Sequence, residues 1–149
     1  MGYLANEIEN AAFTLGIEIS KLPMNEVLEI RKKLAAKFST ESSSPWRLSY
    51  QNLKNTQSIH NQKGWSLIQN YVGANEVLLF VNPDEEKDIW RIPSGEALTA
   101  ILSETVGFPF YVTSQDADYL FCFDDHDCLI AAGQAGQWIT ELRQAGYSM

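Results

Sequence analysis

Basic residues are scarce in the second part of this 149-residue chain. The last 86 residues carry 13 acidic side chains against only Lys87, Arg91 and Arg143, whereas the first 63 carry 6 acids and 8 bases. Most of the formal net charge of −8 therefore lies in one half of the sequence. Such a field favours cationic partners and repels polyanions, so we expect no nucleic-acid binding. Acidic surfaces also serve solubility in general.

Targeting signals, long apolar runs and cysteines are equally scarce. No N-terminal stretch resembles a signal peptide, and no segment is apolar over the length of a membrane span. The two cysteines, Cys122 and Cys128, lie in apolar stretches, as reduced buried thiols do. The glycines of residues 133–136 lack the spacing of a nucleotide-binding loop. These absences predict a cytoplasmic protein with no membrane partner, no cofactor and no enzymatic activity.

The spacing of apolar residues predicts an α+β protein with one domain over residues 1–149. Helical periodicity over Tyr3–Leu15, from Pro23 to Phe38 and from Trp65 to Val72 makes residues 1–73 mainly helical. Between these segments, residues 46–63 are polar and poorly periodic. We expect a loop there with at most one helical turn.

Beyond Gly73 the pattern changes to strands, and residues 74–149 are expected to form the sheet-containing part in the order β-β-α-β-β-β, closed by a C-terminal helix. Ser94 is the expected cap of the intervening helix. The run Tyr119–Phe123 is apolar on both faces, which favours a central strand in a sheet covered on both sides. The expected strands are 77–81, 89–92, 108–113, 119–123 and 128–131, and the last helix is 136–144.

Three connections between the expected strands are acidic. The helix after Ile92 returns the chain, so the strands on either side of it run in the same direction and hairpin turns alternate between the ends of the sheet. The loops 84–88 and 124–127 are then expected at one end, and the loop 116–118 at the other. Seven carboxylates would converge at the first end: Asp84, Glu85, Glu86, Asp88, Asp124, Asp125 and Asp127.

Each acidic loop taken alone has a simpler explanation, because aspartate and serine side chains favour turns by bonding the local backbone. Three successive acidic connections with few basic neighbours favour a partner-binding surface instead. Asp116 and Asp118 form a reserve set of contacts, and Trp90 or Tyr119 would be the apolar anchor. For Trp90, inward packing is the more common alternative.

Cys122, His126 and Cys128 lie close together in the sequence with three aspartates. A structural zinc site needs four converging ligands, and the chain has no second cluster. The loop also lacks the pattern of a calcium-binding EF-hand, so no metal is expected. We expect two buried structural cysteines, which a turn would make cross-strand neighbours. A thiol nucleophile assisted by His126 is the remaining alternative.

Part of the chain resembles a group of known proteins. The segments Phe110–Thr113, Asp118–Cys122, His126–Ile130 and Gly133–Ala135, with Trp138, resemble small bacterial α+β proteins. Some such proteins are similar to the immunity proteins of polymorphic and contact-dependent toxin systems. The resemblance implies a non-enzymatic inhibitor that binds a toxin domain, often a nuclease, inside the cell, and it assigns no functional residue.

These observations predict an immunity protein or similar inhibitor. Its acidic surface would mask the cationic active site of a toxin, because a nuclease is basic where it holds phosphate. The first alternative is a regulatory or scaffolding module that binds a protein partner through the basic residues Arg31, Lys32, Lys33 and Lys37. The second is an enzyme that uses Cys122 or His126.

Overall fold

The computed structural model describes residues 3–40 and 52–147. Within them, seven strands form one antiparallel sheet in the order β1-β4-β3-β5-β6-β7-β2, which confirms the α+β class. The strands are β1 (Ser20–Lys21), β2 (Gln57–His60), β3 (Val77–Phe80), β4 (Trp90–Ile92), β5 (Phe110–Thr113), β6 (Tyr119–Phe123) and β7 (Cys128–Gly133). The helices are α1 (Tyr3–Leu15), α2 (Met24–Phe38), α3 (Gly64–Val72), α4 (Gly95–Ser103) and α5 (Gly136–Gln144).

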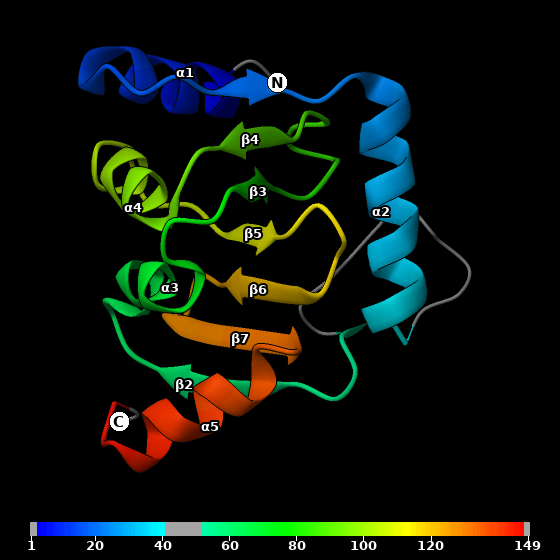
Figure 1. Cartoon of the computed structure of the whole chain (residues 1–149), viewed down its shortest axis with the longest axis vertical. Helices are drawn as coiled ribbons and strands as arrows, with labels where there is room; N and C mark the ends of the chain where they lie inside the picture. Colours follow the sequence, from blue (N-terminus) through cyan, green and yellow to red (C-terminus); the bar gives the residue numbers. More distant parts are fainter. Residues whose placement is uncertain (1–2, 41–51, 148–149) are drawn as a thin grey trace.

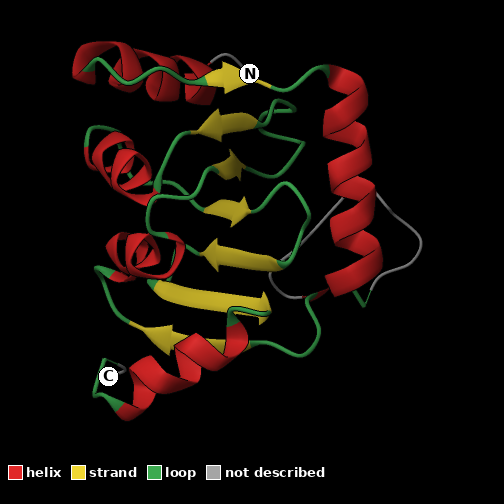
Figure 2. Ribbon diagram, viewed as in Figure 1, coloured by secondary structure: helices red, strands yellow, loops and turns green. Residues whose placement is uncertain are grey.

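Helices cover both faces of the sheet. Figures 1 and 2 show α1, α3 and α4 on one side of the strands and α2 on the other. Because side chains alternate along a strand, Leu79 and Val112 join the core beneath the first set of helices, whereas Leu78 and Tyr111 pack beneath α2. β6 lies fifth of the seven strands and all five of its residues are buried, as its apolar sequence predicts.

Local signals account for the ends of the helices. Gly16 follows α1 with a φ of +72°, and Gly73 follows α3 with a φ of +59°. Both values lie in the left-handed region that glycine adopts most readily. The Ser94 side chain accepts a hydrogen bond from the backbone N–H of Ala97 and so caps α4, as predicted.

The expected loop over residues 46–63 is wrong in its last part, where β2 pairs with β7. Residues 46–51 lie outside the described residues. β2 has a single buried side chain, that of Ile59, so its sequence carries almost no apolar alternation. The strand is instead held by its ladder to β7 and by Arg143 of α5, whose guanidinium donates a 2.8 Å hydrogen bond to the Ser58 carbonyl. The two-residue strand β1 was likewise not predicted.

Candidate functional site

Strand register brings the two most acidic loops to the same end of the sheet. Phe80 pairs with Tyr111, and Phe110 pairs with Phe123. The end of β3, the start of β5 and the end of β6 therefore lie side by side. β3 and β6 are two strand spacings apart, about 10 Å. The loops 81–89 and 124–127 border this end and the loop 114–118 lies at the opposite end, as the expected topology requires.

Two of the seven carboxylates at this end are buried and serve the fold, so they are unavailable to a partner. The Asp124 Oδ1 atom accepts hydrogen bonds of 2.9 Å from the backbone N–H groups of both His126 and Cys128. Glu86 is also buried, and its Oε2 atom accepts a 3.2 Å hydrogen bond from the N–H of Asp88. Each carboxylate takes the place of a backbone acceptor inside its own turn. The need for such acceptors is the simpler explanation of why these loops are acidic.

Asp88 is also engaged. Its carboxylate lies 3.6 Å from the ammonium group of Lys21 on the neighbouring strand β1, and its side chain is half-buried. Hydrogen bonding and ion pairing within the fold therefore engage Glu86, Asp88 and Asp124, so these three are poor candidates for contact with a partner. Three of the other carboxylates are exposed and one, that of Asp127, is half-buried. We call these four residues the acidic end: Asp84, Glu85, Asp125 and Asp127.

The two aromatic residues expected as anchors do not reach the surface. Trp90 is 0% exposed, and its indole N–H donates a 3.1 Å hydrogen bond to the Glu9 carboxylate. Tyr119 is buried with its ring 5.3 Å from that of Tyr71, and burial raises the pKa of its hydroxyl. Both side chains point into the core beneath α1, α3 and α4. Inward packing, the more common alternative for Trp90, is therefore correct.

Other apolar residues lie beside the acidic end. A groove of about 470 Å³ runs between the start of α1, the β3–β4 loop and the segment before β5. Tyr3 is 61% exposed, and the half-buried Phe108 ring makes an edge-on contact with Phe110, with 6.3 Å between ring centroids. We call this feature the acidic groove, and its lining residues are Tyr3, Leu4, Asp84, Glu85, Gly107, Phe108 and Pro109.

The acidic groove was not predicted because its walls lie about 100 residues apart in the chain, which no local pattern reveals. The one available signal was Phe108-Pro109, an aromatic residue beside proline in a segment that the sequence assigned to a strand. The structure begins β5 only at Phe110, since Phe108 and Pro109 stand before the first paired residue. Both are thus free of the sheet and face the groove.

Asp116 and Asp118 lie in the β5–β6 loop, at the opposite end from the acidic groove. Asp116 is exposed and Asp118 half-buried. The ammonium group of Lys37 on α2 donates a 2.9 Å hydrogen bond to the neighbouring Ala117 carbonyl, and the φ of Ala117 is +56°. The reserve contacts therefore belong to a separate surface that is fastened to α2.

The cysteines are not cross-strand neighbours, which corrects the sequence-based expectation. Cys122 is paired with Tyr111 and Ile130, whereas Cys128 is paired with His60 on β2. Burial raises the pKa of the Cys122 thiol, with a smaller contribution from Asp124, and burial also raises the pKa of the half-buried Cys128. A nucleophilic thiol requires the opposite shift. In residues 3–40 and 52–147, no group of three histidine, cysteine or acidic side chains could hold a metal ion.

Arg31 departs from the expected basic face of α2. It is 4% exposed and its guanidinium lies over the Phe80 ring, 5.1 Å from the centroid. Its Nη1 atom donates a 3.2 Å hydrogen bond to the Val81 carbonyl, and its Nη2 atom donates bonds of 3.4 and 3.2 Å to the carbonyls of Glu86 and Lys87. Arg31 thus fastens the β3–β4 loop to α2. The scaffolding alternative required Arg31 to contact a protein partner from the surface of α2, and its burial prevents this.

None of the helices in the described part of the chain is long and apolar enough to cross a membrane. Comparisons of the sequence with protein-family models and with curated proteins, and of the fold with solved structures, give no match. The arguments for function therefore come from the geometry of the acidic end and of its groove.

Proposed function

We propose that the protein is a non-enzymatic inhibitor of the immunity type, which binds a basic toxin domain, such as a nuclease, through the acidic groove. The observation that carries this proposal is the position of exposed carboxylates beside apolar side chains at one end of the sheet. Tyr3 and Phe108 provide contact area that can exclude water, and Glu85 stands at the same groove. An apolar centre with a charged rim is typical of protein-binding surfaces.

The chemistry of the partner follows from this arrangement. A nuclease active site presents arginine and lysine side chains to phosphate, and carboxylates can take the place of the phosphates. Aromatic faces also attract arginine and lysine side chains, so Tyr3 and Phe108 suit the same partner. Asp125 and Asp127 extend the negative surface across the start of β5. The acidic groove would contribute affinity, and the wider acidic end would accelerate association.

The regulatory or scaffolding alternative, in which α2 contacts a cellular protein, has less support. Arg31 is buried, and Lys37 is bonded to the β5–β6 loop. Lys32 and Lys33 of that set are exposed. The enzymatic alternative has no support from the thiols, because burial raises the pKa of both cysteines.

The test begins with capture of the partner from the source organism by the tagged full-length protein. Association rates are then measured from low to physiological ionic strength, together with the nuclease activity of the captured partner. We expect inhibition at equimolar protein and an association rate that falls steeply with salt, since screening weakens charge steering. A partner that stays active, or a rate independent of salt, would contradict the proposal.

A matched pair of variants locates the contact. Glu85→Gln combined with Asp125→Asn removes two exposed charges from the acidic end, whereas Asp116→Asn combined with Glu96→Gln removes two exposed charges elsewhere. We expect the first pair to slow association about tenfold at low salt and the second to change it by less than about twofold. Equal effects of the two pairs would mean that net charge, rather than the acidic end, drives association.

A further inference from the structure

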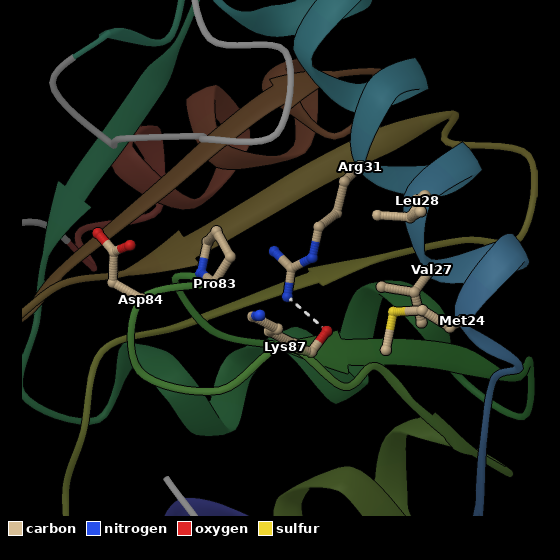
Figure 3. Close-up of a pocket in the computed structure, with 7 residues that line it drawn as sticks. All are labelled: Met24, Val27, Leu28, Arg31, Pro83, Asp84 and Lys87. Atoms are coloured by element: carbon tan, nitrogen blue, oxygen red, sulfur yellow. Dashed lines mark hydrogen bonds between the residues drawn. The ribbon is translucent and has the colours of Figure 1, made fainter.

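A second cavity lies on the other face of the sheet, between α2 and the β3–β4 loop. Its volume is about 490 Å³, within the range of small-molecule sites. In Figure 3, Met24, Val27 and Leu28 of α2 stand on one side of the Arg31 guanidinium, and Pro83 stands on the other. Asp84 lies beyond Pro83, on the far side from Arg31. The cavity therefore combines an apolar wall with a fixed cation, and the Asp84 carboxylate lies at its far edge.

One donor of the Arg31 guanidinium has no hydrogen-bond acceptor. Its hydrogen bonds go to three backbone carbonyls, and its Nε atom is buried without a hydrogen-bond partner. Burial lowers the pKa of Arg31 to about 10, while the nearby Tyr111, Asp88 and Glu86 act in the opposite direction and favour the charged form. An unpartnered buried donor on a cation costs free energy that an acceptor, above all an anionic one, would recover.

Two residues of the apolar wall lie at the surface. Met24 is 46% exposed and Leu28 is 41% exposed, and both lie on the outer rim of the cavity. Methionine is unbranched and adapts its shape to what it contacts. Nε is buried, so wall side chains must shift before a ligand oxygen can reach its N–H. Lys87, exposed on the opposite rim, adds a second positive charge.

We propose that this cavity is a binding site for a small organic acid with an apolar body. The body lies against Met24, Val27 and Leu28, one carboxylate oxygen accepts the Nε–H of Arg31, and the Lys87 ammonium group neutralises the remaining charge. The carboxylate is the specific part, because it meets a cation whose geometry is already set by three carbonyls. Arg31 has therefore two functions: it fastens the β3–β4 loop to α2 and it binds the ligand.

The probe is octanoate, compared with octan-1-ol at constant ionic strength in the full-length protein, with methyl resonances followed by NMR. We expect saturable shifts of the methyl groups of Met24, Val27 and Leu28, and binding of octan-1-ol at least tenfold weaker. Equal binding of the acid and the alcohol would overturn the proposal, because the cation would then contribute nothing. Shifts that do not saturate, or that spread over the whole surface, would overturn it as well.

Variants separate the site from a general effect of charge. Lys87→Glu at the rim should weaken octanoate binding at least fivefold, whereas Lys33→Glu, an exposed residue of α2 that does not line the cavity, should leave it within twofold. Leu28→Asp places a carboxylate in the exposed wall and should abolish binding. Circular dichroism checks that each variant is folded. Unchanged binding in either Lys87→Glu or Leu28→Asp would place octanoate elsewhere and refute the assignment.

Discussion

The β3–β4 and β6–β7 loops are both acidic, and their carboxylates divide between the fold and the surface in the same way. In each loop one carboxylate, that of Glu86 or Asp124, is buried and accepts hydrogen bonds from backbone N–H groups of its own turn. Its neighbour in the sequence, Glu85 or Asp125, is exposed. A clustered negative charge is therefore a mixture of structural and surface residues, and adjacent positions divide between the two functions.

The loops differ in what holds them. Asp124 accepts two backbone hydrogen bonds of 2.9 Å, so the β6–β7 turn is organised by its own side chain. Glu86 accepts one of 3.2 Å, and the β3–β4 loop depends in addition on Arg31 of α2 and on the ion pair of Asp88 with Lys21. A short turn can be satisfied locally, whereas a nine-residue connection requires support from distant segments.

The largest effect is expected for Asp124→Ala. The substitution removes the acceptor of two backbone N–H groups in a part-buried turn, and we expect the free energy of unfolding to fall by about 2 kcal/mol. Urea denaturation measures this loss. Asp124→Asn keeps one acceptor oxygen and should lose about half as much. A loss below about 0.5 kcal/mol for the alanine variant would mean that the turn does not depend on Asp124.

A smaller loss is expected for Arg31→Met. The variant removes three hydrogen bonds to carbonyls but also removes a cation that burial disfavours, so the two effects partly offset each other. We expect a fall of about 1 kcal/mol in the free energy of unfolding. Hydrogen exchange should accelerate in residues 81–88 and remain unchanged in residues 124–127. Equal acceleration in both loops would contradict the claim that Arg31 holds the β3–β4 loop but not the β6–β7 turn.

The fall of stability at alkaline pH is the next test, and Cys122, together with the less buried Cys128, contributes to its start. In the unfolded chain the Cys122 thiol ionises near its ordinary pKa of 9.0, whereas in the fold it stays protonated because burial raises its pKa. The folded state then binds more protons above pH 9, so stability falls as pH rises. We expect Cys122→Ala to flatten the loss between pH 9 and 10 in urea titrations. Above pH 10 the buried Tyr119 should continue the loss in both proteins.

The smallest effect on stability is expected for Glu85→Gln, because Glu85 is exposed. Its free energy of unfolding should stay within about 0.5 kcal/mol of the parent protein. The conservative change at the neighbouring position, Glu86→Gln, should cost more, since Glu86 is buried and accepts a backbone hydrogen bond. Paired urea denaturation curves measure both. A larger loss for Glu85→Gln than for Glu86→Gln would reverse the assignment of structural and surface carboxylates.

Much of the fold could be predicted because its signals are local. The helices over Tyr3–Leu15 and Gly136–Gln144 and the strand Tyr119–Phe123 follow from apolar periodicity within each segment. β2 could not be predicted in this way, because only one of its four side chains faces the core. Its pairing with β7 is a contact between segments about 70 residues apart, which no periodicity within Gln57–His60 indicates.

For the candidate site, the sequence by itself determined the charge, the order of the strands along the chain and hence which loops share an end of the sheet. Only the tertiary structure decided which carboxylates reach solvent and that Trp90 and Arg31 are buried. It also decided that Tyr3, Phe108 and Glu85 line one groove. The physical reason is that composition and connectivity are properties of the chain, whereas burial and hydrogen bonding depend on the side chains that distant segments bring to each position.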